Sequence, residues 1–143
     1  GGVTVALASR RPEELQGLVL WAAAETGVVV QAFRQRMEEG GYYQDERGCF
    51  DMGGLWVNGS FLEDMEKWDL PASAGRFPGP VLIIHGSADG LVPVETAYKY
   101  QRAFAENPEL VIIEGADHTF NRHDWEKQVL QKTVEFFKNT LTP

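Results

Sequence analysis

The feature that most limits how this chain can fold is a pair of continuous apolar runs in its second half, over residues 81–85 and 110–113. Such runs are typical of strands buried on both faces, as in parallel sheets. A helical pattern follows each run, over about 93–104 and about 121–141. The alternation of strand and helix predicts an α/β fold with a parallel sheet.

The first part of the chain continues this pattern. Residues 2–10 predict a helix with a face of small residues, and the apolar run over 17–21 predicts a third buried strand. We expect the last helix to pack on the sheet through a stripe of apolar residues. This stripe consists of Leu130, Val134, Phe137 and Leu141.

Residues 26–79 differ from both flanks, because short elements alternate there with turn residues. The pattern predicts a helix over 28–37, a small hairpin over 42–50 and a short helix with Ser60 as its N-cap. Prolines and glycines over 71–80 then predict a loop.

Small insertions of this kind often form lids over a binding site, and half of the chain's aromatic residues lie in this one. We therefore expect three parts, with regular strands and helices on either side of an insertion. The parts are residues 1–25, a lid or cap over 26–79, and a C-terminal core over 80–143.

Composition argues against several classes of partner. The chain carries 13 Lys and Arg against 21 Asp and Glu, a net charge of -8, and such a chain is repelled by the phosphates of nucleic acids. No apolar run is long enough for a membrane-spanning helix, so we expect no membrane partner. A single cysteine, Cys49, excludes an internal disulfide and favours a reducing compartment, which predicts a cytoplasmic protein.

Two loops follow the late strands, and each contains a group suited to acid–base chemistry. These groups are Asp89 and His118. Because the carboxyl ends of neighbouring parallel strands meet at one rim of the sheet, we expect both to lie there. A carboxylate can accept the Nδ1 proton of an imidazole, which leaves Nε2 free to take a proton from a hydroxyl nucleophile. Asp89 and His118 are therefore the predicted catalytic residues.

Each of these residues also has a plainer interpretation. Asp89 could cap the turn before Pro93, and His118 could be a loop histidine bonded to backbone. Asp117 is a minor alternative for the acid, because sequence neighbours rarely reach Nδ1. His85 is predicted to be a packed residue at the end of a strand.

Other candidates are weaker. His123, in the first turn of the last helix, is expected to be solvated. Ser60 and Ser87 lack the glycine-flanked turn of a serine nucleophile. Cys49 is expected to be a small buried apolar residue. No spacing predicts a metal or nucleotide site, so no cofactor is expected.

At these positions the sequence resembles the α/β-hydrolase superfamily. The acid of these enzymes lies in a His-Gly-x-x-Asp-x-x-Val-Pro pattern, which residues 85–93 match in full, and their histidine lies in a Gly-x-x-His pattern, which residues 115–118 match. The chain order, acid before histidine, also agrees. Residues 1–20 resemble the helix, turn and strand that follow the Gly-x-Ser-x-Gly nucleophile elbow, with Gly1 as its last glycine.

Within the superfamily, the chain is most similar to cinnamoyl or feruloyl esterases and to serine-aminopeptidase-like hydrolases. This similarity rests on the short lid with a hairpin, over 54–68, and on residues 114–118. The resemblance implies a small-molecule ester substrate, hydrolysed through an acyl-enzyme without a cofactor.

The chain departs from the family pattern in one respect, because it contains no Gly-x-Ser-x-Gly. The serine would lie before Gly1, so we expect this chain alone to be inactive. We also expect self-association or pairing with the missing N-terminal half, since the sheet would expose an edge. Two alternatives stay open. One is half of a split enzyme whose serine lies on another chain, and the other is a non-catalytic module that binds a ligand or a protein.

Overall fold

The computed structural model describes residues 1–41, 43–51, 54 and 56–141. The chain forms two compact units. We call residues 1–24 and 70–143 the core unit and residues 25–69 the inserted unit. In the described part of the chain, no helix is long and apolar enough to cross a membrane.

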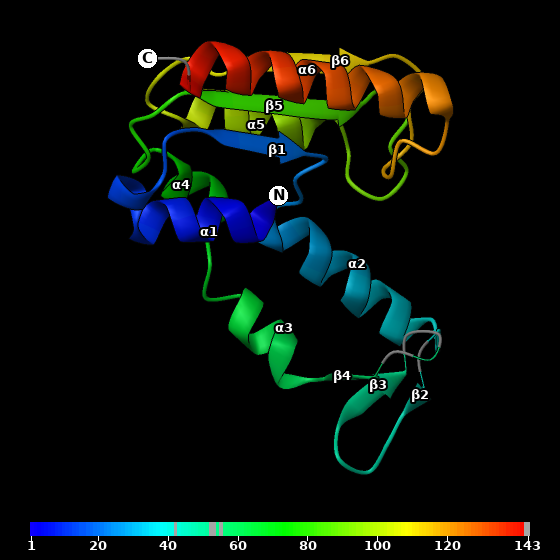
Figure 1. The fold of residues 1–143 in the computed structure, drawn as a ribbon. Coiled ribbons are helices and arrows are strands. Elements are labelled where there is room, and N and C mark those ends of the chain that lie inside the picture. Colours follow the sequence, from blue (N-terminus) through cyan, green and yellow to red (C-terminus); the bar gives the residue numbers. More distant parts are fainter. Residues whose placement is uncertain (42, 52–53, 55, 142–143) are drawn as a thin grey trace. The chain divides into compact units, whose positions relative to one another are not determined.

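The core unit is built on a three-stranded parallel sheet in the order β1-β5-β6 (Figure 1). The strands are β1 (Leu18–Trp21), β5 (Val81–Gly86) and β6 (Glu109–Ile113). Every residue of the central strand β5 is buried, because a central parallel strand is covered on both faces. The predicted α/β class with a parallel sheet is confirmed.

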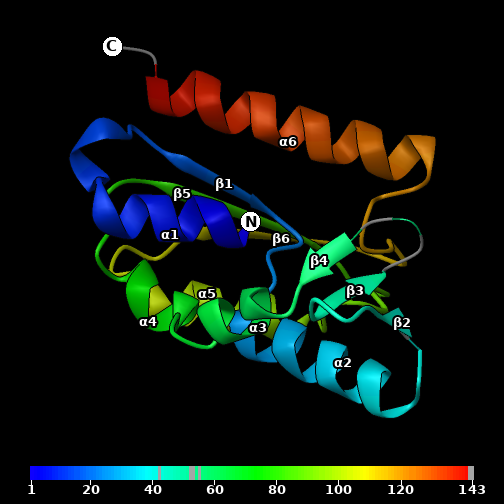
Figure 2. The same ribbon diagram turned by 90° about the horizontal axis from the view of Figure 1, so that it is seen from below.

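Helices cover both faces of this sheet (Figure 2). One face carries α1, α4 and α5, and the other carries α6. A short 3-10 turn, Pro12–Glu14, joins α1 to β1. The four helices are α1 (Gly2–Arg10), α4 (Leu70–Ala74), α5 (Glu95–Ala103) and α6 (His123–Leu141).

The helix α6 packs through a face that only partly agrees with the predicted one, because Phe137 alone of the four predicted residues packs against the buried cluster. Leu130, Val134 and Leu141 are about half exposed. Val129 and Phe136 are buried instead, in a cluster with apolar residues of β5 and β6. The helix carries apolar residues on two stripes, and periodicity alone does not indicate which stripe the sheet covers.

The loop predicted over residues 71–80 is wrong in its first part. Here α4 forms, with Leu70 and Ala74 buried, and it packs against α1 and α5. Pro71 lies in its first turn, where backbone N–H groups have no acceptor within the helix, so the N–H that proline lacks costs no hydrogen bond. Because α4 belongs to the core unit, the insertion ends at residue 69 rather than at the predicted 79.

The inserted unit contains two helices and a three-stranded antiparallel sheet in the order β2-β3-β4. The first two strands form a hairpin. The predicted hairpin also included Tyr42, which lies outside the described residues. The sequence did not predict β4, which is only 3 residues long. The elements are α2 (Thr26–Glu38), β2 (Tyr43–Gln44), β3 (Cys49–Asp51), β4 (Trp56–Asn58) and α3 (Ser60–Met65).

The inserted unit has a small core of its own. Phe33 of α2 and Phe50 of β3 meet edge to face, with ring centroids 6.0 Å apart. Val30 and Leu62 complete this buried cluster. An ion pair between Arg34 and Glu66 adds a surface contact between α2 and the end of α3.

Candidate active site

The loops that leave β5 and β6 are bonded to each other at the carboxyl rim of the sheet. Ser87 donates its N–H to the Ile113 carbonyl at 3.0 Å, and Ala88 donates its N–H to the Ala116 carbonyl at 3.0 Å. In the opposite direction, Gly115 donates its N–H to Ser87 Oγ at 2.8 Å. The two loops predicted to carry an acid and a histidine therefore form one connected structure.

Gly86, the last residue of β5, permits this close approach. A Cβ at this position would lie 2.2 Å from the carbonyl oxygen of Ala116 and 2.9 Å from that of Asp117. Both oxygens belong to the backbone, so neither can swing away as a flexible side chain could. The sequence indicated Gly86 only as part of a motif. Its position directly after the apolar run over 81–85 was the available signal for its role.

The side chain of Asp89 is fully buried, and both of its carboxylate oxygens are engaged. Oδ1 accepts the N–H groups of Leu91 at 2.9 Å and of Val92 at 2.8 Å. Oδ2 lies 2.8 Å from Nδ1 of His118. The two interpretations of Asp89 are therefore compatible, because one oxygen closes the turn while the other meets the imidazole.

These contacts determine the charge of Asp89. Burial acts to raise the pKa of its carboxyl group, but hydrogen bonds from Val92, His118 and Leu91 outweigh burial and lower the pKa from its ordinary value of 3.8. Asp89 is therefore ionised at neutral pH and can only accept hydrogen bonds. It follows that His118 carries a proton on Nδ1, which leaves Nε2 as its basic nitrogen.

His118 lies on a tightly bonded loop with 30% of its side chain exposed. Asp117 accepts the N–H groups of Thr119 at 3.2 Å and Asn121 at 3.0 Å, and also the side-chain amide of Asn121 at 3.1 Å. Asp117 thus shapes the loop, whereas the imidazole is paired with Asp89. Phe120 adopts a left-handed φ of 56°, and strain of this kind tends to cluster at functional sites.

His85 is also part of this cluster. Its side chain is buried, and its Nε2 lies 2.9 Å from the Val92 carbonyl oxygen and 3.3 Å from Asp89 Oδ2. The prediction of a packed histidine at a strand end agrees with this position. Its contact with the acid was not predicted.

The remaining candidates from the sequence lie elsewhere or have structural contacts. His123 is exposed at the start of α6. Ser60 is the first residue of α3 rather than its N-cap, which is Gly59, and Asn58 Oδ1 accepts the Ser60 N–H at 2.9 Å. The predicted cap is wrong because the Asn58 side chain forms the turn there. Cys49 is half-buried rather than buried.

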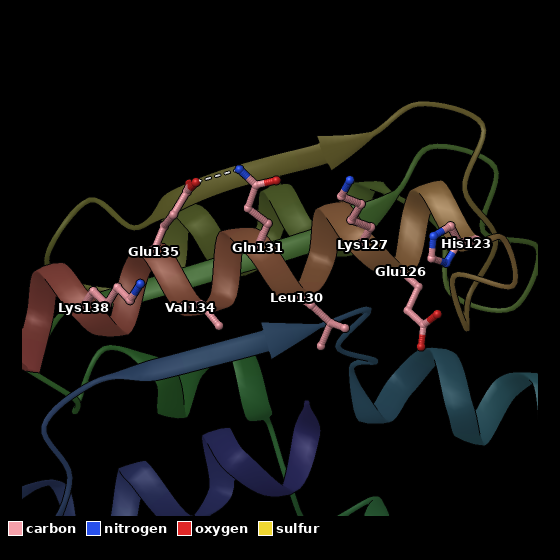
Figure 3. A pocket seen from close by; sticks show the side chains of 8 residues that line it. All are labelled: His123, Glu126, Lys127, Leu130, Gln131, Val134, Glu135 and Lys138. Atoms are coloured by element: carbon pink, nitrogen blue, oxygen red, sulfur yellow. Dashed lines mark hydrogen bonds between the residues drawn. The ribbon is translucent and has the colours of Figure 1, made fainter.

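A surface groove of about 590 Å³ runs along α6 (Figure 3). Its lining includes the exposed Leu130 and Val134, and Gln131 donates a hydrogen bond to Glu135 at 2.9 Å beside them. All of its lining residues come from one helix, and neither Asp89 nor His118 is among them. We therefore do not place catalysis there. Among the described residues, no group of three or more His, Cys, Asp or Glu could hold a metal ion.

Comparison with known proteins agrees with this fold. A model of the prolyl oligopeptidase family, peptidase family S9, matches residues 2–143. The chain belongs to the prolyl oligopeptidase family. The resemblance to α/β-hydrolases that the two loop motifs indicated is thereby confirmed. No match was found among curated proteins.

Solved structures of α/β-hydrolases share the fold of this family member. Est1E from Butyrivibrio proteoclasticus is 20% identical with a TM-score of 0.77, over 99% of this chain and 58% of its own. The same protein with ferulic acid bound is 20% identical with a TM-score of 0.75, over 99% and 56%. Alpha/beta hydrolase domain-containing protein 10 from mouse is 20% identical with a TM-score of 0.70, over 99% and 60%. The chain thus spans less than two thirds of the length of these structures and forms part of an α/β-hydrolase fold.

Proposed function

We propose that this chain supplies the acid, Asp89, and the histidine, His118, of a serine hydrolase that cleaves carboxylic esters. The observation that carries the proposal is the 2.8 Å contact between His118 Nδ1 and Oδ2 of the fully buried Asp89 side chain. This pair lies at the carboxyl rim of a parallel sheet, where α/β proteins bind their ligands.

In the proposed reaction, Nε2 of His118 takes the proton of a serine hydroxyl as its oxygen attacks the ester carbonyl. The same nitrogen then gives that proton to the departing alcohol, and the acyl group stays on the serine. Water then attacks the acyl carbonyl while His118 takes its proton, and His118 returns that proton to the serine oxygen as the carboxylic acid leaves. Asp89 stabilises the imidazolium that forms in each half of the reaction, and no step uses a cofactor.

The proposal assigns the serine to residues outside this sequence, which contains no Gly-x-Ser-x-Gly. The start of α1 supports this assignment. A Cβ on Gly1, the N-cap of α1, would lie only 2.3 Å from the Cβ of Ala23, which follows β1. The helix start therefore packs at the carboxyl end of β1, the rim on which Asp89 and His118 also lie. A residue joined to this helix start would enter the rim beside them.

We further propose that the outer edge of β1 receives a strand from the segment that carries this serine. β1 pairs with β5 on one side, and a groove between α1 and α6 follows its other side. Val3 and Leu7 of α1 and Trp21 of β1 line this groove and are exposed. An added strand would cover these side chains and would pair the free backbone edge.

We propose that the acyl group of the ester is a hydroxycinnamoyl group. We also propose that the inserted unit is the lid. Support comes from Est1E, which has a similar fold and has been solved with ferulic acid bound. The test is made on the protein that includes the serine, and it measures the ratio of kcat/KM for feruloyl and acetyl esters of the same alcohol. A preference for the acetyl ester would contradict this choice of substrate and would leave the proposed mechanism intact.

The mechanism is tested with a fluorophosphonate probe, which labels a serine only when a histidine activates it. We expect no label on the 143-residue chain. We expect label on a serine of the preceding segment when the protein is produced with that segment. His118→Ala should abolish this label, whereas His123→Ala, at an exposed histidine, should preserve it.

Two outcomes would contradict the proposed mechanism. The first is label on Ser87 or Ser60 of the 143-residue chain, because either serine would then be the nucleophile. The second is label in the longer protein that survives His118→Ala. Peptide mapping of the labelled protein distinguishes the serines in both cases.

A further inference from the structure

The chain contains three histidines, and the buried one, His85, has no part in the proposed reaction. It lies at the end of β5 with a side-chain exposure of 0%. Its Nε2 faces two oxygens, the Val92 carbonyl at 2.9 Å and Asp89 Oδ2 at 3.3 Å. Its Nδ1 is buried and has no hydrogen-bond partner among the described residues.

These contacts fix the proton of His85. A carbonyl oxygen and an ionised carboxylate can only accept hydrogen bonds, so Nε2 must carry a proton. A second proton on Nδ1 would create a buried donor without an acceptor, which is strongly unfavourable. His85 is therefore a neutral imidazole with its proton on Nε2.

We propose that His85 is the positioning residue of the acid, because its Nε2–H binds the Val92 carbonyl and thereby fixes the loop that carries Asp89 to β5. The N–H groups of Leu91 and Val92 fix Oδ1 of Asp89 relative to its own loop. His85 adds a bond from the buried strand to that loop, through the carbonyl of the same Val92. This role of His85 rests on the proposed function only for its consequence in catalysis.

A neutral donor suits this role. A neutral His85 can bond the Val92 carbonyl without bringing a positive charge that would compete with His118 for Oδ2 of Asp89. If the Nε2–H were lost, the buried Val92 carbonyl would lack its donor, and the loop that carries Asp89 would lose its side-chain bond to β5. We then expect the bond between His118 Nδ1 and Asp89 to weaken, and His118 to populate both neutral tautomers.

The test is ¹⁵N NMR spectroscopy of the 143-residue chain, in which each imidazole nitrogen reports whether it carries a proton. In the unmodified chain, we expect His85 to be protonated on Nε2 only. We expect His118 to show a downfield, slowly exchanging proton on Nδ1. A proton on Nδ1 of His85, with none on Nε2, would overturn the proposal without any variant.

Two substitutions separate positioning from packing. His85→Gln keeps an amide N–H close to the position of Nε2 and should retain the downfield His118 proton. His85→Met has a similar volume without a donor and should lose that proton. His123→Gln, at an exposed site of α6, is the matched control and should leave the His118 signals unchanged.

If His85→Met lowers the melting temperature but leaves the His118 signals intact, His85 only packs and the proposal is wrong. Should His85→Met fail to fold, the unmodified chain and His85→Gln still decide, because loss of the His118 proton in His85→Gln also contradicts the proposal. Absence of serine labelling in the protein produced with the preceding segment, together with the expected NMR signals, would reject the proposed function while leaving the role of His85 standing.

Discussion

Asp45 in the inserted unit and Asp89 in the core unit close their turns in nearly the same way, but their second oxygens differ. Asp45 Oδ1 accepts the N–H groups of Arg47 at 3.0 Å and Cys49 at 2.9 Å, and Oδ2 binds the Arg47 guanidinium within the same turn. Asp89 Oδ1 also accepts two N–H groups, but its Oδ2 meets His118 from another strand's loop. The turn is structural in both cases, and the distant partner marks Asp89 as the candidate acid.

The pKa direction does not separate these two residues. The pKa of Asp45 is lowered first by the backbone hydrogen bond from Cys49, with Arg47 contributing further. The pKa of Asp89 is also lowered, although burial acts to raise it. What differs is the surroundings, because the Asp89 carboxylate is held away from water and aimed at an imidazole. A lowered carboxyl pKa therefore indicates a catalytic acid only together with burial and a distant partner.

The largest expected difference between the two residues is in catalysis. In the protein that includes the serine, Asp89→Asn should slow fluorophosphonate labelling by about 10⁴-fold, the loss of rate that follows the same acid-to-amide change in a serine protease triad. An amide keeps an acceptor for the turn but favours the wrong tautomer of His118. Asp45→Asn should leave the labelling rate unchanged. If the labelling rate of Asp89→Asn stayed within about tenfold of that of the unmodified protein, Asp89 would no longer differ from Asp45 as the candidate acid.

The next expected difference is in packing. Gly86→Ala places a Cβ against the backbone oxygens of Ala116 and Asp117, which should lower the free energy of unfolding by about 3 kcal/mol. Gly90→Ala, in the same loop, meets no atom within 4 Å and should change it by less than about 1 kcal/mol. Urea unfolding measures both variants. Equal changes in the free energy of unfolding would show that the two loops are not closely packed at Gly86.

The sequence was sufficient to predict the pairing of Asp89 with His118. Two buried strand runs predict a parallel sheet, and parallel neighbours bring the loops after them to one rim. Within each loop, the family motif then indicated which residue faces the other. The Asp45 turn, in contrast, lies in a unit whose short strands and small core give weak periodic patterns, and β4 was missed there.

Other features could not be read from the sequence because they depend on where the backbone runs. The buried stripe of α6, with Val129 and Phe136, is chosen by the position of the sheet rather than by periodicity. The contact of His85 with the Val92 carbonyl depends on how the acid loop folds back over β5. Neither the helix pattern nor the motif at residues 85–93 contains that information.

A smaller expected difference lies in turn stability. Asp89→Ala leaves the N–H of the buried Val92 without its acceptor and should destabilise the core unit by roughly 2 kcal/mol. Asp45→Ala should have a smaller effect, because water can reach the exposed Arg47 N–H in its turn. Hydrogen exchange, read separately for amides of each unit, measures both changes. A larger increase in hydrogen exchange for Asp45→Ala than for Asp89→Ala would show that the Asp45 turn contributes more to stability, contrary to this prediction.

The smallest expected difference is in the pH dependence of stability. A carboxyl group whose pKa is lower in the folded state binds fewer protons there than in the unfolded chain. Its stabilisation is therefore fully present above the unfolded pKa, close to the ordinary value of 3.8, and is lost as the pH falls through the lower folded pKa. Both aspartates act in this direction, so the unfolding free energy should fall on acidification below about pH 5.

Salt should separate their contributions, because screening weakens the bond of Asp45 to the exposed Arg47 guanidinium more than the contacts of the fully buried Asp89 carboxylate. Asp117 and Glu135 also have lowered pKa values, but they are present in every variant and cancel in the comparison. At high salt, we expect Asp89→Asn to flatten the decline between about pH 5 and 3, and Asp45→Asn to leave it nearly unchanged. If Asp45→Asn flattened the decline more, the carboxylate coupled most strongly to folding would be the one in the surface turn. The buried hydrogen bonds of Asp89 would then be weaker than their geometry indicates.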